Sequence, residues 1–208
     1  MAGDGSLAPT LAIFWLAVGY LSGSVPYGFL LAKFGGLGDV RAIGSGNIGA
    51  TNVLRTGSKK IAFATLLCDM LKGALPVVLA RYFAGDTAAA IAGFGAFIGH
   101  VIPVWLKVKC GKGVATYLGV LFAVAWPLAA IFIIVWLLLA AVFRYSSVSS
   151  LGGVAAVPLA AILLNTGAVL TLMVPVAMIV IYAHRGNIGR LIRGEESKIT
   201  FKRSTSGA

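Results

Sequence analysis

Long apolar stretches separated by short polar loops run through most of the chain. The stretches 8–32, 61–83, 87–106, 113–143 and 147–184 are each long enough for a membrane helix, because crossing about 30 Å of hydrocarbon takes roughly 20 residues. The last two are longer than one crossing requires. Pro127 interrupts the first of these two, and Asn165 lies within the second. The pattern predicts an all-α, polytopic membrane protein.

The positions of the basic residues indicate how many times the chain crosses. Apart from Lys72 and Arg81, lysine and arginine fall at Arg144 and in the segments 33–60, 107–112, 185–193 and 198–203. Cytoplasmic loops of membrane proteins carry an excess of these residues. We therefore expect all of these basic segments to lie on the cytoplasmic side.

This placement resolves the two long stretches. Since Lys112 and Arg144 are expected on the same side of the membrane, the stretch 113–143 must cross it twice. We expect a short helix over about 112–125 and a second helix over 127–143. The same reasoning makes 147–184 a hairpin that turns near Asn165. The prediction is seven transmembrane helices with an external turn at 81–86, the N-terminus outside and the C-terminus cytoplasmic. Five longer spans are the alternative.

One membrane domain accounts for nearly the whole chain. We expect a single integral membrane domain over residues 1–193, followed by a polar cytoplasmic tail over 194–208. The N-terminus lacks the positive region of a cleavable signal peptide, so the first stretch is expected to be a retained span. Gly19 with Gly23, and Gly95 with Gly99, have the four-residue spacing that lets helices pack closely.

The amino-acid composition agrees with a membrane protein and shows a net positive charge. Apolar residues make up 59% of the 208 positions and charged residues 11%, against about 25% charged in soluble domains; the mean hydropathy is +0.97. The 17 basic residues against 6 acidic ones give a net charge of +11, so the polar face attracts anions. The basic residues are scattered between apolar runs, which does not indicate a nucleic-acid partner. No Cys/His cluster is present, and neither a metal nor a bound cofactor is expected.

The first polar loop contains glycines in the G-x-G-x-x-G pattern, at Gly44, Gly46 and Gly49, with Asp69 about 20 residues further on. That combination resembles a dinucleotide-binding fingerprint. The fingerprint requires a preceding strand and a βαβ unit, whereas membrane spans flank this loop. We therefore reject a Rossmann site.

The same loop is suited to binding an anion. Glycines let backbone N–H groups converge on an anion, and Arg55 adds a planar charge that matches phosphate or carboxylate. Neutral hydrogen-bonding groups lie between them: Ser45, Asn47, Thr51 and Asn52. We predict an anion site here; a tight turn at the membrane surface is the alternative.

The second polar loop carries Gly111, Lys112 and Gly113 at the start of the predicted short helix. It is not a Walker A motif, because no Ser or Thr follows Lys112. The first N–H groups of a helix are unpaired and favour an anion, and Lys112 adds a full charge beside them. Together the two loops predict a pocket for more than one phosphate.

Further polar residues fall near the same membrane face. Ser150 lies in a serine-rich segment, and His184 and Asn187 share a helix face at i and i+3. His100 lies near the cytoplasmic end of the third span, where ionisable residues are rare; it either takes part in chemistry or supports the Gly-Lys-Gly loop. Asp69 and Lys72, three residues apart in the second span, are expected to pair.

These motifs together resemble a known family. Residues 44–52 and 111–116, and His184 and Arg185 with Asn187, look like the bacterial acyl-phosphate:glycerol-3-phosphate acyltransferases, the PlsY family. The similarity extends from about Gly19 to Arg193. Members of the family tend to have Gly where this chain has Cys110.

The resemblance implies an activity and a location. It implies a seven-helix enzyme of the bacterial cytoplasmic (inner) membrane whose active site lies near the cytoplasmic face. The enzyme would transfer a fatty acyl chain from acyl phosphate to the sn-1 hydroxyl of glycerol 3-phosphate. The products would be lysophosphatidic acid and phosphate, in the first acylation step of phospholipid synthesis.

Carried over residue by residue, the resemblance also assigns the site. The acyl-phosphate group is expected on Gly111, Lys112, Gly113 and Ser45. Glycerol 3-phosphate is expected on Arg55, Asn47, Ser150, His184 and Asn187. Ser45, Lys112 and His184 are the candidate catalytic residues, and His100 is a secondary candidate. Both His184 and the substrate's own phosphate are candidates for the general base.

The expected partners are the two small-molecule substrates, acyl phosphate and glycerol 3-phosphate, and membrane lipid. The oligomeric state is left open, and a monomer is compatible with every prediction.

Two other classes of function compete with this one, beside a purely structural membrane protein. A transporter of phosphorylated metabolites or lipids would use the N-terminus of the short fourth helix to face an anion, but related halves are not visible in the sequence. An intramembrane serine hydrolase would use Ser45 or Ser150 with His100 or His184. The G-x-S-x-G elbow of such hydrolases is absent from the sequence.

Overall fold

The structure is a computed structural model that describes residues 7–105, 111–164 and 167–199, with side chains throughout except over 167–171. Cys110 and the turn expected near Asn165 lie outside these residues. Every element in the described ranges is helical. In chain order the elements are α1 (Pro9–Ser24), α2 (Tyr27–Phe34), η1 (Val40–Ala42), α3 (Ala50–Leu54), α4 (Lys59–Val101), α5 (Val114–Phe143), α6 (Ser146–Leu163), α7 (Gly167–Ala183) and α8 (Arg185–Ile192).

Several of these elements are long and apolar enough to cross a membrane. Within the described residues there are four such candidates: Pro9–Phe34, which joins α1 and α2, then Lys59–Val101, Val114–Phe143 and Ser146–Leu163. A fifth is obtained if Leu172–Ala183 of α7 and the whole of α8, which are bent by 52° relative to each other, are counted together. The predicted all-helical membrane fold is confirmed.

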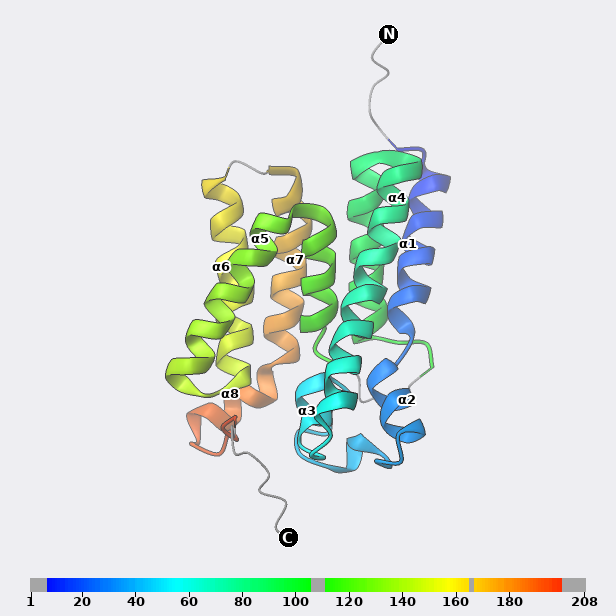
Figure 1. Cartoon of the computed structure of the whole chain (residues 1–208). Helices are drawn as coiled ribbons and strands as arrows, with labels where there is room; N and C mark the ends of the chain where they lie inside the picture. Colours follow the sequence, from blue (N-terminus) through cyan, green and yellow to red (C-terminus); the bar gives the residue numbers. More distant parts are fainter. Residues whose placement is uncertain (1–6, 106–110, 165–166, 200–208) are drawn as a thin grey trace.

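Two of the candidates are broken inside. Gly85 in α4 has φ 80 and ψ −172, and Ala125 in α5 has φ −156 and ψ 85, both outside the helical range. These breaks coincide with the predicted turn at 81–86 and with the interruption predicted near Pro127. A 43-residue helix would be about 65 Å long at 1.5 Å per residue, twice the hydrocarbon thickness. Figure 1 shows instead that α4 ascends beside α1, turns and descends again.

The spaced glycines hold α1 against the second half of α4. A methyl group at Gly19 would lie 2.0 Å from the carbonyl oxygen of Ala92, and one at Gly23 would lie 1.9 Å from that of Ala96. In return, methyl groups at Gly95 and Gly99 would meet carbonyl oxygens of α1 at 2.4 and 2.1 Å. The two backbones therefore touch directly, as the four-residue spacing predicted.

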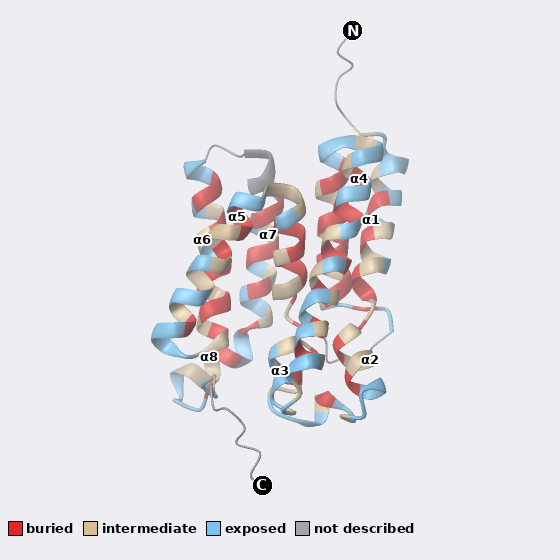
Figure 2. Ribbon diagram, viewed as in Figure 1, coloured by how far each residue is buried: buried red, intermediate tan, exposed pale blue. Residues whose placement is uncertain are grey.

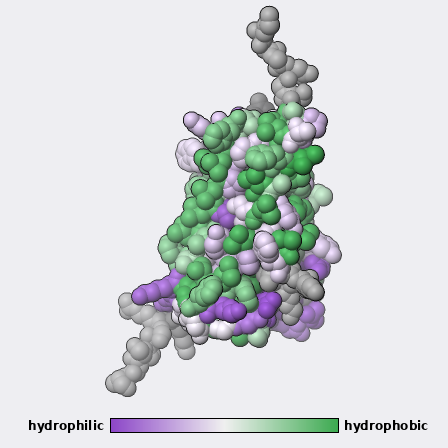
Figure 3. All heavy atoms as spheres, turned by 90° about the vertical axis from the view of Figure 1, so that its right-hand side faces the viewer, coloured by the Kyte–Doolittle hydropathy of each residue, from purple (hydrophilic) through white to green (hydrophobic). Residues whose placement is uncertain are grey.

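The helices form two groups that meet along a central core. In Figure 1, α1, α2 and α4 lie on one side and the helices α5 to α7 on the other, while α3 and α8 lie at the end nearer the C-terminus. Buried residues face the middle of the bundle (Figure 2), among them Phe97, Tyr117, Leu121 and Met173. Many large hydrophobic side chains remain exposed. Figure 3 shows hydrophobic surface over the body, with strongly hydrophilic residues gathered towards the end that carries α3 and α8.

Candidate active site

A single buried amide organises the first polar loop. Asn52, 2% exposed, donates from Nδ2 to the carbonyl oxygens of Val40 and Asn47, both at 2.7 Å. Its Oδ1 accepts from the backbone N–H of Ser45 at 3.0 Å and from the Ser45 hydroxyl at 3.3 Å. Arg55 lies one helical turn after Asn52, and its NH1 reaches the same Oδ1 at 3.4 Å. The loop is thereby folded so that Ser45, Asn47 and Arg55 border one cavity.

The second polar loop ends at the N-terminus of α5. Gly113 precedes this helix with φ 78 and ψ 0, a left-handed conformation that glycine adopts without strain. A methyl group there would also lie 2.3 Å from Phe97 Cε2. Because the helix starts here, the first N–H groups of α5 have no partner within the helix. Lys112 and Gly113 line the same cavity as the first loop.

The side chain of Lys112 has a lowered pKa. Burial is the main cause that lowers its pKa, to about 8, and the positive charges of Arg190 and Arg55 lower it further, while Glu196 acts in the opposite direction. Lys112 lies between α4 and α5, outside the spanning helices. Near neutral pH it is therefore a charged and partly buried ammonium group, whose attraction to an anion is stronger than it would be in bulk water.

Three more of the predicted residues come from the other helix group. Ser150 on α6 donates to the carbonyl of Ser146 at 2.8 Å and accepts from Trp136 Nε1 at 3.3 Å. His184 and Asn187 are buried at the α7–α8 junction. His184 Nδ1 lies 2.8 Å from the Val180 carbonyl oxygen. Since a carbonyl only accepts, Nδ1 carries the proton, and Nε2 of the neutral ring is an acceptor.

The C-terminal segment, which the sequence presents as a polar tail, supplies a residue that the sequence reasoning missed. The carboxylate of Glu196 accepts from Asn187 at 2.6 Å, from Ser147 at 2.8 Å and from Arg190 at 2.7 Å. Burial alone would raise the pKa of Glu196, but these three hydrogen bonds bring it below its ordinary value. Its charged carboxylate thus joins α6 and α8 at the edge of the cavity.

Ser197, the next residue, contacts the first polar loop. Ser197 Oγ accepts from Arg55 NH2 at 2.6 Å. The tail therefore also contacts the residue after α3, and both Glu196 and Ser197 line the cavity. One feature of the sequence could have indicated a role for Glu196: it is one of only 6 acidic residues in a strongly basic chain.

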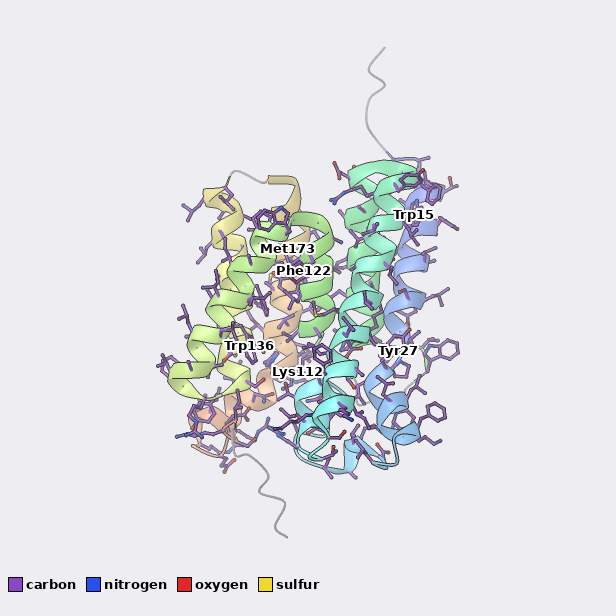
Figure 4. All side chains as sticks on the ribbon, in the orientation of Figure 1. Trp15, Tyr27, Lys112, Phe122, Trp136 and Met173 are labelled. Carbon is purple, nitrogen blue, oxygen red and sulfur yellow. The ribbon has the colours of Figure 1, made fainter. Side chains whose placement is uncertain are left out.

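All of these groups border one cavity of about 480 Å³. Its polar end holds Ser45, Asn47, Arg55, Lys112, Gly113, Ser150, His184 and Asn187, and His100 lines it as well. Gly111, also a predicted site residue, is buried beside His100 and is not among the residues that line the cavity. A wall of apolar side chains continues from the polar end, formed by Leu66, Met70, Leu118, Phe122, Phe132, Ile133, Trp136 and Leu137. Figure 4 shows Lys112 near the end that carries α8, with Trp136 and Phe122 further along the bundle.

A second, smaller cavity of about 230 Å³ meets the first at Lys112. It shares Ser45, Asn47, Lys112 and Asn187 with the larger cavity and adds Arg185 and Arg190. The structure therefore brings together polar residues from the two polar loops, from α6 and from the α7–α8 junction, and it joins an apolar compartment to a basic one.

Comparison with known proteins assigns this arrangement to a family. A model of the family described as glycerol-3-phosphate acyltransferase matches residues 13–194. The chain belongs to this family. It is a membrane acyltransferase, so the transporter, serine-hydrolase and structural-protein alternatives are set aside.

Individual relatives cover almost the whole of this acyltransferase. The glycerol-3-phosphate acyltransferase of Mesorhizobium japonicum is 55% identical over 190 residues, which are 91% of this chain and 97% of the relative. That of Brucella anthropi is 54% identical over 202 residues, 97% of this chain and all of the relative. The match therefore extends past residue 194 into the tail that carries Glu196.

Solved structures of PlsY, described as an integral membrane glycerol 3-phosphate acyltransferase, have the same fold. The glycerol 3-phosphate form superposes with a TM-score of 0.86 at 36% identity, covering 91% of this chain and 96% of that one. The lysophosphatidic acid form gives 0.83 at 35% identity, covering 91% and 95%.

Proposed function

We propose that this acyltransferase moves a fatty acyl group from acyl phosphate to the sn-1 hydroxyl of glycerol 3-phosphate. The products are lysophosphatidic acid and inorganic phosphate, and the reaction is the first acylation of phospholipid synthesis. The main support is the cavity itself, which joins a basic, glycine-rich end to a long apolar wall. The related PlsY structures in glycerol 3-phosphate and lysophosphatidic acid forms support the same substrate and product.

The chemistry needs little beyond binding and charge. Acyl phosphate is a mixed anhydride, so phosphate leaves readily and a covalent acyl-enzyme is unnecessary. The glycerol hydroxyl attacks the acyl carbon, a new C–O ester bond forms, and the bond to phosphate breaks with its electron pair on the phosphate oxygen. The protein must hold both phosphates, align hydroxyl and carbonyl, and stabilise the charge that moves to the departing phosphate.

The two sides of the cavity suit different substrates. We assign the acyl-phosphate group to Lys112, the backbone of Gly111 and Gly113, and Ser45, because the charged amine and the free N–H groups of α5 gather there. The acyl chain then follows the apolar wall. We assign glycerol 3-phosphate to the opposing polar residues Arg55, Asn47, Ser150, His184 and Asn187. Ser45, Lys112 and His184 are the proposed catalytic residues.

The proton of the attacking hydroxyl has two possible destinations. His184 supports one of them, because its Nδ1 is engaged with a carbonyl and its Nε2 is left to accept a hydroxyl proton. The departing phosphate is the other. The two are separated by the His184 experiment below.

The topology proposed is seven transmembrane helices with the N-terminus outside and the C-terminus inside. The breaks at Gly85 and Ala125 support it by dividing α4 and α5 into two segments each. The hydrophilic end of the molecule (Figure 3), with the basic residues around α3 and α8, then lies at the cytoplasmic face of the bacterial inner membrane. The polar end of the cavity opens towards that face. We take residues 1–193 as the membrane domain and 194–208 as a cytoplasmic tail whose first part completes the site.

Two variants test these roles with purified enzyme in detergent. Lys112→Ala should nearly abolish formation of lysophosphatidic acid, and retention of most activity would refute the phosphate-binding role of the loop. His184→Ala should lower the maximal rate at saturating glycerol 3-phosphate if His184 is the base. A variant that loses affinity for glycerol 3-phosphate but keeps its maximal rate would assign the proton to the phosphate instead.

A further inference from the structure

A cluster of buried polar side chains lies beside the Gly-Lys-Gly loop, and two of its members, Asp69 and His100, also line the cavity. The side chains of Lys72, Asp69 and His100 are only 2%, 3% and 3% exposed, and Thr116 is fully buried. Ionisable groups inside a membrane protein are costly and rarely present without a role. The proposed reaction uses none of the four, so their arrangement calls for a separate explanation.

Lys72 fixes one end of the cluster. Its Nζ lies 2.8 Å from Asp69 Oδ1 and donates to the carbonyl of Val25 at 2.8 Å, at the break between α1 and α2. The backbone carbonyl of Lys72 accepts from Ser22 at 2.8 Å. Lys72 is therefore fixed between the Asp69 carboxylate and the chain around the α1–α2 break, and the predicted pairing of Asp69 with Lys72 is confirmed.

His100 connects the Asp69 carboxylate to the loop. Its Nδ1 lies 3.1 Å from Thr116 Oγ1, in the first turn of α5, and 3.8 Å from Asp69 Oδ1. These two neighbours set the orientation of the imidazole. The opposite edge of the ring then faces Gly111, where an added methyl group would lie 1.9 Å from His100 Nε2.

We propose that His100 is a positioning residue whose Nε2 edge supports the backbone of Gly111 and so holds Lys112 in the cavity, while Asp69 and Lys72 hold the imidazole. The sequence left open whether His100 takes part in chemistry or supports the loop, and this contact favours support. The inference rests on the proposed phosphate-binding role of the loop. It explains why a charged pair is buried next to residues that need a fixed backbone.

The direct test is a double-mutant cycle between the two groups in contact. Gly111→Ala alone places a methyl group against the imidazole, so kcat/KM for acyl phosphate should fall at least tenfold. In His100→Ala the support is lost and kcat/KM falls as well. In the double variant the new methyl group occupies space that the ring has vacated, so the loss due to Gly111→Ala should be relieved. Adding Gly111→Ala to His100→Ala should cost less than about threefold in kcat/KM, against at least tenfold in the parent, a coupling of the size seen between contacting residues.

Gly113→Ala is the matched control in the same loop. Its methyl group would meet Phe97 and not His100, and its φ of 78 strains any other residue. His100→Ala should therefore leave the defect of Gly113→Ala unrelieved. Additive losses in the His100/Gly111 cycle, or an equal recovery of Gly113→Ala, would overturn the inference.

A second pair of variants keeps the test valid if His100→Ala does not fold. The amide of glutamine reaches the position of Nε2, whereas that of asparagine reaches only the position of Nδ1. Support through Nε2 predicts that His100→Gln keeps kcat/KM within about threefold of the parent, while His100→Asn loses at least tenfold at the same melting temperature. Equal losses of kcat/KM in the two variants, or losses that parallel a fall in the melting temperature, would contradict support through Nε2. If Lys112→Ala stays active, the proposed phosphate-binding role of the loop is refuted, whatever the outcome of the His100 experiments.

Discussion

Raising the pH should inactivate this acyltransferase by removing the proton from Lys112. Burial, with Arg190 and Arg55 nearby, lowers the pKa of this amine to about 8. A neutral amine has lost the charge that binds a phosphate dianion. One pH unit above the pKa only about a tenth of the molecules remain protonated, so kcat/KM at pH 9 should be roughly a tenth of its value at neutral pH.

The assay measures release of phosphate and formation of lysophosphatidic acid at low substrate concentration between pH 6 and 9.5. The rate of spontaneous acyl-phosphate hydrolysis is subtracted at each pH. The decisive variant is Lys112→Arg, whose guanidinium stays charged throughout. Its maximal rate should be lower, but the decline above pH 8 should disappear.

Lys60→Arg is the matched control, because Lys60 is exposed at the start of α4. It should keep the alkaline decline of the parent. A parent enzyme whose kcat/KM stays level up to pH 9.5 would refute the reasoning, and so would a decline near pH 8 that persists in Lys112→Arg. Calorimetric titration with a non-hydrolysable acyl-phosphate analogue over the same pH range provides a second readout that does not depend on turnover.

Three further changes test other parts of the structure. Glu196→Gln removes a negative charge that raises the pKa of Lys112, so the alkaline decline should move to lower pH; an unmoved decline would contradict this electrostatic influence of Glu196 on Lys112. Ser150→Ala removes the hydroxyl assigned to glycerol 3-phosphate, whose hydrogen bond is worth about 0.5–1.5 kcal/mol, and should raise KM for glycerol 3-phosphate about two- to tenfold without changing KM for acyl phosphate. The reverse pattern would exclude Ser150 from the glycerol 3-phosphate side. Gly23→Ala forces a methyl group to within 1.9 Å of a carbonyl oxygen of α4 and should lower stability by about 1–3 kcal/mol, seen as a lower melting temperature; a parent-like melting temperature would show that the helices separate freely.

Local sequence patterns were sufficient for much of the fold. The lengths of the apolar stretches and the positions of the basic residues predicted where the helices run and where two of them break, at Gly85 and near Ala125. The four-residue glycine spacing predicted the close approach of α1 and α4. Each of these signals depends on neighbouring residues, which is why the sequence alone reveals it.

The parts of the site that were missed depend on contacts between distant residues. Glu196 contacts Ser147, which lies 49 positions earlier, and Ser197 contacts Arg55, which lies 142 positions earlier. A polar tail gives no local signal of such pairing. Likewise, the sequence shows two amides in the first loop, Asn47 and Asn52, but not that Asn52 is the one buried at its centre.

The acyl donor is the most direct test of the account. Purified enzyme would be given labelled glycerol 3-phosphate with either acyl phosphate or acyl-CoA of the same chain length, and lysophosphatidic acid would be measured with its acyl position. A site that holds the acyl-phosphate group at Lys112 predicts rapid sn-1 acylation from acyl phosphate, lost in Lys112→Ala, and little from acyl-CoA. Equal or faster transfer from acyl-CoA would contradict the proposed function.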